Sequence, residues 1–294
     1  MYQLGWFSTG RGKGSRGLLK VVQDSINSGE IDAEIAFVFC SREHGETEAT
    51  DIFLKMIEDY HIPLITFSYQ KFKSRTGTTS TDQGKSLPSW RLDYDREVMA
   101  RLQSFNPDLC VLAGYMLIVG PEMCQQYDML NLHPAAPAGP AGTWQEVIWQ
   151  LIECQAEETG AMMHLVTPEL DKGPVVTYCT FPIRGEPFDK HWEEIKGHPV
   201  QQIKREQGED NALFKLIRQY GVVRELPLVV ATIKAFSQGK VKITADKQVV
   251  DAEGKPIRGY NLTDEIDKKV NGETQRREVR NKEPGKADLV PPQL

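Results

Sequence analysis

The sequence predicts an α/β protein whose core is a Rossmann-like open sheet, mostly parallel and twisted, with helices on both faces. Three observations support this prediction. A short apolar strand at residues 4–8 runs directly into a glycine-rich segment and a helix. Short apolar runs then alternate with longer helical patterns, which is the rhythm of βαβ units. Polar side chains follow one of these runs at its carboxyl end, where open α/β sheets bind their ligands.

The first half of the chain supplies most of the expected sheet. Its strands are short apolar runs bounded by glycine, proline or polar residues, as buried strands are. The first helix carries an apolar stripe that includes Leu19, Val22 and Ile26. After the strand at residues 4–8, strands are expected over residues 34–40, 63–67 and 109–113, and helices over residues 18–26, 46–60 and 93–104.

Turn and capping signals delimit the elements of the second half. Gly120-Pro121 opens a helix, because a proline in the first turn loses no hydrogen bond. Thr143 and Glu146 have the spacing of a capping box, which predicts a helix over residues 143–156. Strands are expected over residues 129–132, 160–167 and 173–182, the last two as a hairpin-like pair near the sheet edge.

The chain is expected to form one main domain over residues 1–260 and a charged tail over residues 261–294. Residues 76–90 are rich in Gly, Ser and Thr without periodicity, and residues 186–211 are polar, so both are interpreted as insertions. A helix broken by a proline is expected over residues 211–239. The tail contains prolines and few apolar residues, which predicts a mobile segment.

Composition narrows the class of protein. A formal net charge of −6 disfavours nucleic-acid binding, which needs a basic surface. No apolar run approaches the ~18 residues of a membrane-spanning helix, and the N-terminus lacks a signal pattern. The five cysteines include no C-x-x-C pair, which indicates a reducing compartment, gives no metal site and predicts a cytoplasmic protein.

The glycine-rich segment at residues 10–17 is predicted to bind an anion. A strand, a glycine loop and a helix in succession aim backbone N–H groups at a negative charge, and three basic side chains add positive charge. Gly12-x-Gly14-x-x-Gly17 also matches the dinucleotide fingerprint, although a match of this kind is weak alone. A dinucleotide-binding protein is therefore an alternative from a different class, with Glu43 as the acid that would meet the ribose.

Asn131 and His133 are the first candidates for chemistry. They lie two residues apart at the end of a short strand, so their side chains point to the same face. An amide donor and a group that titrates near neutrality suit proton transfer and the stabilisation of negative charge. The structural alternative is a strand end whose side chains satisfy the turn at Pro134.

Several motifs resemble those of the folate-dependent formyltransferases, above all the enzymes that act on glycinamide ribonucleotide (GAR). The run GYMLIVGPEM from Gly114, followed by NLHPAAPAGPAG, is similar to the family's loop and its Asn-x-His-Pro strand end. The segments GAMMHLV from Gly160 and ELDKGPVV from Glu169 are similar to the segment that carries the family's catalytic Asp. The resemblance covers most of residues 1–260 and implies the formyltransferase fold and catalytic domain.

The resemblance implies transfer of a formyl group from 10-formyltetrahydrofolate to a primary amine of a small phosphorylated substrate, in the simplest case GAR in purine biosynthesis. Catalysis would depend on Asn131, His133 and Asp171, with His164 in second rank. The residues expected to hold the folate co-substrate are Tyr115, Met116, Leu117, Ile118, Val119, Val166, Thr167 and Glu169. The substrate phosphate is expected at Gly14, Ser15 and Arg16. No metal is required.

Each catalytic residue has an expected role. The reaction forms a tetrahedral intermediate with a negatively charged oxygen, and the attacking amine must lose a proton. Asn131 and His133 are assigned to the oxygen. The carboxylate of Asp171 would keep His133 cationic and steer a water that relays the proton.

The chain departs from the GAR enzymes at four positions, which leaves the acceptor open. Arg16 stands where the family has asparagine, and Leu117 where it has arginine. Trp144 replaces a basic or histidine-containing stretch, and Val222 replaces a glutamate that helps to bind the sugar. The alternatives are another amine, such as an amino sugar, or water, as in the formyl-folate hydrolases. The expected partners are small molecules, and a homodimer is left open.

Overall fold

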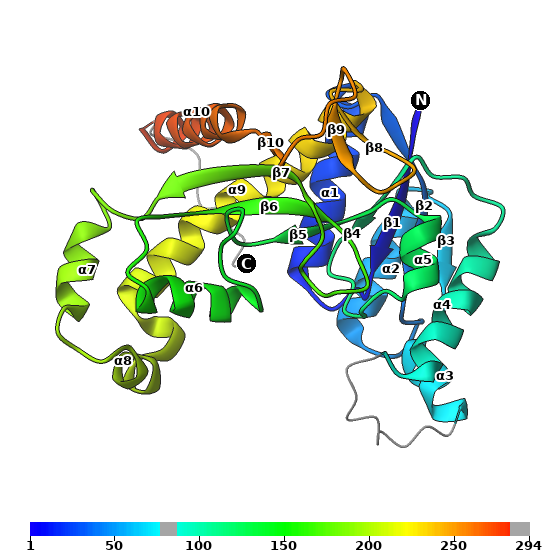
Figure 1. The fold of residues 1–294 in the computed structure, drawn as a ribbon, viewed down its shortest axis with the longest axis horizontal. Helices are drawn as coiled ribbons and strands as arrows, with labels where there is room; N and C mark the ends of the chain where they lie inside the picture. Colours follow the sequence, from blue (N-terminus) through cyan, green and yellow to red (C-terminus); the bar gives the residue numbers. More distant parts are fainter. Residues whose placement is uncertain (77–86, 283–294) are drawn as a thin grey trace. The chain divides into compact units, whose positions relative to one another are not determined.

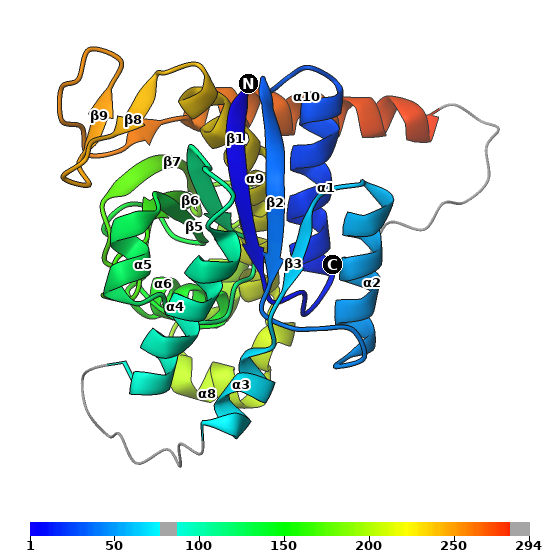
Figure 2. The ribbon, with the colours of Figure 1, turned by 90° about the vertical axis from the view of Figure 1, so that its right-hand side faces the viewer.

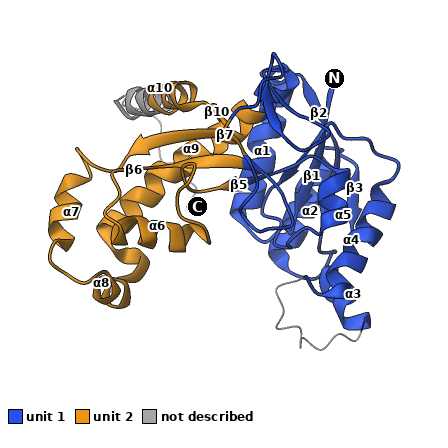
Figure 3. Ribbon diagram, viewed as in Figure 1, with its two compact units in different colours: residues 1–132, 164–174, 233–257 blue, residues 133–163, 175–232, 258–294 orange. Residues whose placement is uncertain are grey.

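The computed structural model describes residues 1–76 and 87–282, with side chains as far as residue 272 (Figure 1). The chain divides into two compact units, which Figure 3 colours separately. Unit 1 consists of residues 1–132, 164–174 and 233–257, and unit 2 of residues 133–163, 175–232 and 258–294. Most of the predicted insertion at residues 76–90 lies outside the described residues.

Unit 1 contains the parallel sheet that the sequence predicts. Its strands are β1 (Tyr2–Ser8), β2 (Ala33–Cys40), β3 (Leu64–Thr66), β4 (Leu109–Leu112) and β5 (Met129–His133). They are neighbours in the order β3-β2-β1-β4-β5, and every neighbouring pair is parallel. The chain moves outward in one direction from β1 to β3 and in the other from β4 to β5. A topological switch point therefore lies between β1 and β4, where ligands bind in open sheets.

Helices cover both faces of this sheet. They are α1 (Lys13–Asn27), α2 (Glu48–Asp59), α3 (Tyr69–Arg75), α4 (Ser89–Leu102) and α5 (Pro121–Gln126). Figure 2 shows α1 and α2 on one side of β1–β3 and α4 and α5 on the other. The predicted α/β class, with a parallel sheet between helices, is confirmed.

An aromatic core fills the space between the sheet and helices α4 and α5. The ring centroids of Phe7 and Phe39 lie 5.6 Å apart, and that of Tyr115 lies 5.9 Å from Phe7. Tyr94 of α4 and Met123 of α5 are fully buried in the same cluster. This core holds the ends of β1, β2 and β4 in place, and the candidate site lies at those ends.

Helix α1 begins earlier than the sequence suggested. It starts at Lys13, five residues before the expected start at residue 18, and so includes Gly14 and Gly17. A glycine inside a helix costs about 1 kcal/mol relative to alanine, which is why the pattern indicated a loop. Burial of Leu19 and Val22 on the sheet side stabilises the whole helix. Much of the glycine-rich segment is therefore the first turn of a helix.

A small antiparallel hairpin completes unit 1. It consists of β8 (Val241–Ile243) and β9 (Val249–Asp251). Between them Lys247 donates to the carboxylate of Asp128, with 2.7 Å between Nζ and Oδ1. This contact ties the hairpin to the residue that precedes β5.

Unit 2 contains strands β6 (Glu158–Leu165), β7 (Val175–Pro182) and β10 (Tyr260–Asn261), which are neighbours in that order. Strands β6 and β7 are antiparallel. At one end Leu165 N donates to Pro174 O, and at the other Ile183 N donates to Glu157 O, at 2.9 Å in both cases. The predicted hairpin-like pair is confirmed, and β10 adds a short parallel strand beside β7.

Helices make up much of unit 2, including the polar stretch at residues 186–211 and part of the expected tail. Its helices are α6 (Trp144–Glu153), α7 (Asp189–Ile195), α8 (Val200–Glu206), α9 (Ala212–Ser237, which continues into unit 1) and α10 (Thr263–Lys282), with a 3₁₀ turn at Gly208–Asp210. The polar stretch at residues 186–211 forms α7 and α8 because each buries one side chain, Trp192 or Ile203. Part of the expected tail forms α10, in which Ile266 is fully buried and Asp267 accepts from Arg224 at 3.0 Å.

The predicted capping box at the start of α6 is confirmed. Thr143 Oγ1 accepts from Glu146 N at 3.3 Å, and Thr143 N donates to the Glu146 carboxylate at 2.7 Å. Replacing Thr143 with alanine is expected to lower the free energy of unfolding by about 1 kcal/mol, because an N-cap acceptor is lost. Urea denaturation measures this change. Thr143→Ser is the control, and an equal loss in both variants would contradict the capping role.

Candidate active site

A cavity in unit 1 lies at the carboxyl ends of β4 and β5. It is open to solvent and is lined by Leu112, Tyr115, Leu117, Ile118, Val119, Asn131, His164, Val166, Thr167, Leu170 and Asp171. Most of these side chains are apolar, while an amide, an imidazole and a carboxylate gather among them. A largely apolar hollow with a few polar groups is typical of a small-molecule site.

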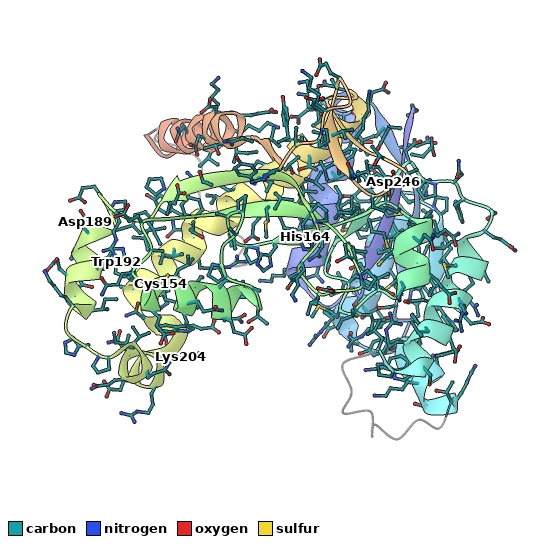
Figure 4. The ribbon with its side chains drawn as sticks, viewed as in Figure 1. Cys154, His164, Asp189, Trp192, Lys204 and Asp246 are labelled. Carbon is teal, nitrogen blue, oxygen red and sulfur yellow. The ribbon has the colours of Figure 1, made fainter. Side chains whose placement is uncertain are left out.

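Asn131, His164 and Asp171 form the polar cluster of this cavity, and Figure 4 labels His164. Asn131 Nδ2 lies 3.3 Å from His164 Nε2, which lies 3.6 Å from Asp171 Oδ1. His164 Nδ1 lies 3.1 Å from the carbonyl oxygen of Leu165, which accepts only, so Nδ1 carries a proton. Nε2 faces both the Asn131 amide and the Asp171 carboxylate, so it accepts one N–H of Asn131 when the ring is neutral and donates when the ring is protonated. His164 therefore sets which way the Asn131 amide faces.

The turn that carries Asp171 is constrained by its backbone. Asp171 has a φ of +54°, in the left-handed region that Asp and Asn tolerate best among side-chain-bearing residues. A Cβ atom on Gly173 would overlap the carbonyl oxygen of Leu165, so only glycine fits there. The hydrogen bond from Leu165 N to Pro174 O closes the turn. The backbone thus holds the Asp171 carboxylate beside His164.

His133, the third predicted catalytic residue, belongs to unit 2. It is the last residue of β5, two residues after Asn131, and its side chain is buried. Its Nε2 lies 2.9 Å from the carbonyl oxygen of Pro140. The structure thus brings Asn131 and Asp171 together around His164, and the role of His133 beside them stays a prediction.

Six of the eight residues predicted to hold the co-substrate line the cavity. They are Tyr115, Leu117, Ile118, Val119, Val166 and Thr167. Met116 does not line it and is 57% exposed, and Glu169 instead pairs with Lys172 at the surface. The sequence reasoning missed Leu112 and Leu170. Leu112 was predicted only as part of a strand, although its place near the carboxyl end of that strand was a usable signal.

A buried ion pair on α4 anchors the loop over residues 115–119, which forms one wall of the cavity. Arg91 and Asp95 are 4% and 2% exposed and lie 2.8 Å apart. Arg91 Nη2 donates to the carbonyl oxygen of Ile118 at 2.6 Å, and Gly120 N donates to Asp95 Oδ2 at 2.7 Å. Burial raises the pKa of the Asp95 carboxyl, while the Arg91 charge opposes that rise. The sequence reasoning missed this pair, whose signal was an Arg and an Asp four residues apart in a helical pattern.

The predicted phosphate residues Gly14, Ser15 and Arg16 occupy the first turn of α1. Gly12 precedes the helix and provides no capping side chain, and the first turn contains no acidic residue. Gly14 is exposed and Ser15 is buried, while Arg16 Nη1 lies 3.4 Å from the carbonyl oxygen of Ala49. The helix dipole and the N–H groups of the first turn favour an anion at this position.

Cys40 and Cys179 are buried thiols. Burial raises the pKa of Cys40 to about 12 and that of Cys179 to about 11, so both thiols stay protonated near neutral pH. No group of three or more His, Cys, Asp or Glu side chains within residues 1–76 and 87–282 is arranged to hold a metal ion. Over the same residues, no helix combines the length and apolarity that crossing a membrane demands.

The orientation of the Asn131 amide can be tested through His164. His164→Leu removes the acceptor for one N–H of Asn131, so we expect the reaction at this site to slow by up to about 10²-fold in kcat, the order of loss that misplacing a catalytic group produces. His164→Gln, whose side-chain oxygen accepts a hydrogen bond, should retain more of the rate. Steady-state kinetics measure both variants, and equal rates for the two would contradict the positioning role.

The chain is similar to formyltransferases in both sequence and structure. A family model described as formyl transferase matches residues 12–187, which include the polar cluster and the first turn of α1. The phosphoribosylglycinamide formyltransferase of Haemophilus influenzae is 28% identical over 246 residues, covering 82% of this chain and 92% of that protein. The structure of the phosphoribosylglycinamide formyltransferase of Coxiella burnetii matches with a TM-score of 0.60 at 19% identity, over 88% of this chain and 98% of that one. The latter likeness shows a shared fold.

A deformylase is also similar in sequence to this chain. The formyltetrahydrofolate deformylase of Haemophilus influenzae is 23% identical over 150 residues, covering 50% of this chain and 44% of that protein. The similarity to the formyltransferase is both higher and much longer. The relatives thus include both a formyltransferase and a deformylase. An assay must therefore distinguish transfer of a formyl group to an amine from its hydrolysis.

Proposed function

The chain belongs to the formyl transferase family, and we propose that it transfers the formyl group of 10-formyltetrahydrofolate to the primary amine of GAR, a reaction of purine biosynthesis. One observation carries the proposal. Asn131, His164 and Asp171 form a single polar cluster in an otherwise largely apolar cavity. The long similarity to a phosphoribosylglycinamide formyltransferase supports the choice of acceptor.

The cluster suits the two requirements of formyl transfer. The carbonyl oxygen of the formyl group becomes negatively charged in the tetrahedral intermediate and needs a donor. Asn131 donates one N–H to His164, and we assign its second N–H to this oxygen together with His133. The attacking amine must lose a proton, and the carboxylate of Asp171, beside His164, accepts it directly or through a water. As the bond from the formyl carbon to N10 breaks, this proton passes to N10, and tetrahydrofolate leaves.

We infer that the cavity takes the pterin ring system of a reduced folate. Branched aliphatic and aromatic side chains line most of it. Two of the apolar side chains that line it stay exposed, Ile118 at 38% and Leu170 at 60%. They extend the apolar surface toward the part of the co-substrate that continues beyond the ring.

The first turn of α1 suits the phosphate of the acceptor. Its N–H groups and the positive end of the helix dipole attract an anion, and Arg16 adds a charge where the resembled family has a neutral asparagine. We therefore expect a phosphorylated acceptor to bind more tightly than its unphosphorylated form, and this preference to weaken with rising salt.

The dinucleotide alternative loses its acidic residue. Glu43 was the candidate for contact with a ribose, yet its carboxylate accepts from Lys71 Nζ at 2.7 Å and from Ser68 N at 3.0 Å. These hydrogen bonds hold the pKa of Glu43 below its usual range, the bond from Lys71 having the larger effect. Both oxygens hold the start of α3, so a ribose would have to compete with these hydrogen bonds.

The test is a formyl-transfer assay with 10-formyltetrahydrofolate, run with GAR, with a panel of amino sugars and their phosphates, and with no amine. We expect GAR to be formylated and the release of tetrahydrofolate to depend on GAR. Release at the same rate without an amine would identify a hydrolase, the second candidate that the deformylase relative suggests. No turnover with any acceptor would reject the proposal.

The cytoplasmic location and the domain boundary at residue 260 stay predictions. The homodimer, which the sequence leaves open, is a further question. Sedimentation of the full chain tests the homodimer, and fluorescence microscopy of the tagged protein tests the location. A monomer at micromolar concentration would reject the homodimer without affecting the proposed reaction.

A further inference from the structure

Three buried hydroxyl groups lie at the carboxyl ends of β1 and β2, outside the catalytic cluster. Ser8, Thr9 and Ser41 are all fully buried. Ser41 Oγ donates to Thr9 Oγ1 at 3.0 Å, and Ser8 Oγ donates to the carbonyl oxygen of Ala113 at 2.8 Å. Burial of hydroxyl groups is costly unless each is hydrogen-bonded, so these bonds define one arrangement of the strand ends.

Thr9 connects this group to the loop that lines the cavity. Thr9 N donates to the carbonyl oxygen of Gly114 at 3.1 Å, and Thr9 Oγ1 accepts from Met116 N at 2.9 Å. Thr9 thus holds both Gly114, which precedes the loop, and Met116, the second residue of the loop. Only the bond from Met116 N involves the Thr9 side chain, so a substitution of Thr9 can remove this bond and leave the backbone bond to Gly114 in place.

The same residues hold the start of the glycine-rich segment. Gly10, the residue after Thr9, has a φ of +64° and donates through its N–H to Ser8 Oγ at 3.0 Å. Gly114 has a φ of +70°, and a Cβ atom added to it would lie 2.5 Å from Ser15 Oγ. Ser15 belongs to the turn assigned to phosphate. The anion site and the loop over residues 115–119 therefore share a single framework with Thr9 at its centre.

We propose that Thr9 is a positioning residue that couples the two substrate sites, so that an anion at the first turn of α1 strengthens folate binding in the cavity. This inference rests on the proposed function for the identity of the two ligands. Each ligand contacts a segment that Thr9 holds, and ordering one segment lowers the entropy cost of ordering the other. The coupling is reciprocal, so the folate must strengthen anion binding by the same factor.

The experiment uses a pair of ligands that cannot react. Tetrahydrofolate carries no formyl group, and ribose 5-phosphate carries no amine. Calorimetry gives the Kd of tetrahydrofolate for the full chain with and without saturating ribose 5-phosphate. In the unmodified protein we expect the phosphate to tighten folate binding about fivefold, the lower end of typical coupling between sites.

Variants of Thr9 separate positioning from mere stability. Thr9→Val keeps the shape but cannot accept from Met116 N, so we expect the ratio of the two Kd values to fall to about one. Thr9→Ser keeps the hydroxyl group and should keep the coupling. Ser41→Ala is the matched control, because it removes a hydrogen bond to Thr9 and leaves the Met116 contact in place. If Thr9→Val does not fold, Thr9→Ala provides the same comparison.

The outcomes distinguish this inference from the proposed function. If both ligands bind the unmodified protein with a ratio of one, the coupling is rejected and the function stands. An unchanged ratio in Thr9→Val, or loss of coupling in Ser41→Ala to the same extent, rejects the role of Thr9. If tetrahydrofolate does not bind at all, the proposed function fails and this inference fails with it.

Discussion

Replacing Asp171 with asparagine is expected to lower kcat for formyl transfer about 10³-fold, within the range that a positioned acid or base contributes. The change removes the negative charge 3.6 Å from His164 and the acceptor for the amine proton. It keeps the size of the side chain, and asparagine tolerates the left-handed backbone at this position as well as aspartate does. The KM values for both substrates should change far less than kcat.

A matched control lies on the same turn. Lys172 is exposed and pairs only with the surface side chain of Glu169 in the contacts described above. Lys172→Ala should therefore leave kcat near that of the unmodified enzyme. Equal melting temperatures for the two variants would show that the turn is intact. A kcat for Asp171→Asn within a few-fold of the control would exclude Asp171 from proton transfer.

Replacing Arg91 with methionine is expected to destabilise the protein by about 3–5 kcal/mol, the cost of leaving a buried charge without its partner. Asp95 is 2% exposed, so water does not compensate its carboxylate. Arg91 also donates to the carbonyl oxygen of Ile118, so the variant loses an anchor of the cavity wall as well. Urea denaturation measures the free energy of unfolding.

The pH dependence of this variant follows from Asp95. Burial already raises the pKa of its carboxyl, and removing the Arg91 charge raises it further. A group whose pKa is higher in the folded state favours folding below its unfolded pKa of about 3.9 and loses that contribution as pH rises through the folded value. The variant should therefore lose more stability at neutral pH than near pH ~4.

A double variant tests whether the unpaired charge is the cause. Arg91→Met with Asp95→Leu removes both charges and should recover part of the lost stability. Full recovery is not expected, because the N–H of Gly120 and the carbonyl of Ile118 lose their partners. If the double variant is less stable than Arg91→Met, the loss comes from packing rather than from the buried carboxylate.

The sequence predicted the sheet of unit 1 well because its strands are short apolar runs with clear boundaries. It predicted helix boundaries less well where glycine propensity and tertiary burial oppose each other. Gly14 and Gly17 indicated a loop, but burial of Leu19 on the sheet outweighs their cost in α1. The C-terminal residues appeared too polar to pack, yet one buried side chain, Ile266, anchors α10.

The candidate site could be predicted only where a local motif carries the residues. Asn131 and Asp171 lie in short motifs that resemble the formyltransferases, so both were found. Thr9 was missed because its contact with Met116 depends on β1 and β4 being neighbours, which no local pattern shows. The spacing of Arg91 and Asp95 was a local signal for their ion pair, but the contact of Arg91 with Ile118 depends on where α4 packs.

The two compact units are interleaved along the chain. Each consists of three separate stretches, and β5, β6 and α9 each contain residues of both. Neither unit can be excised by trimming an end or by a single cut, so a truncated fragment would lack essential pieces. Swapping one unit between relatives would require several simultaneous crossovers. Exchange of acceptor preference among relatives is therefore expected to proceed by point substitutions.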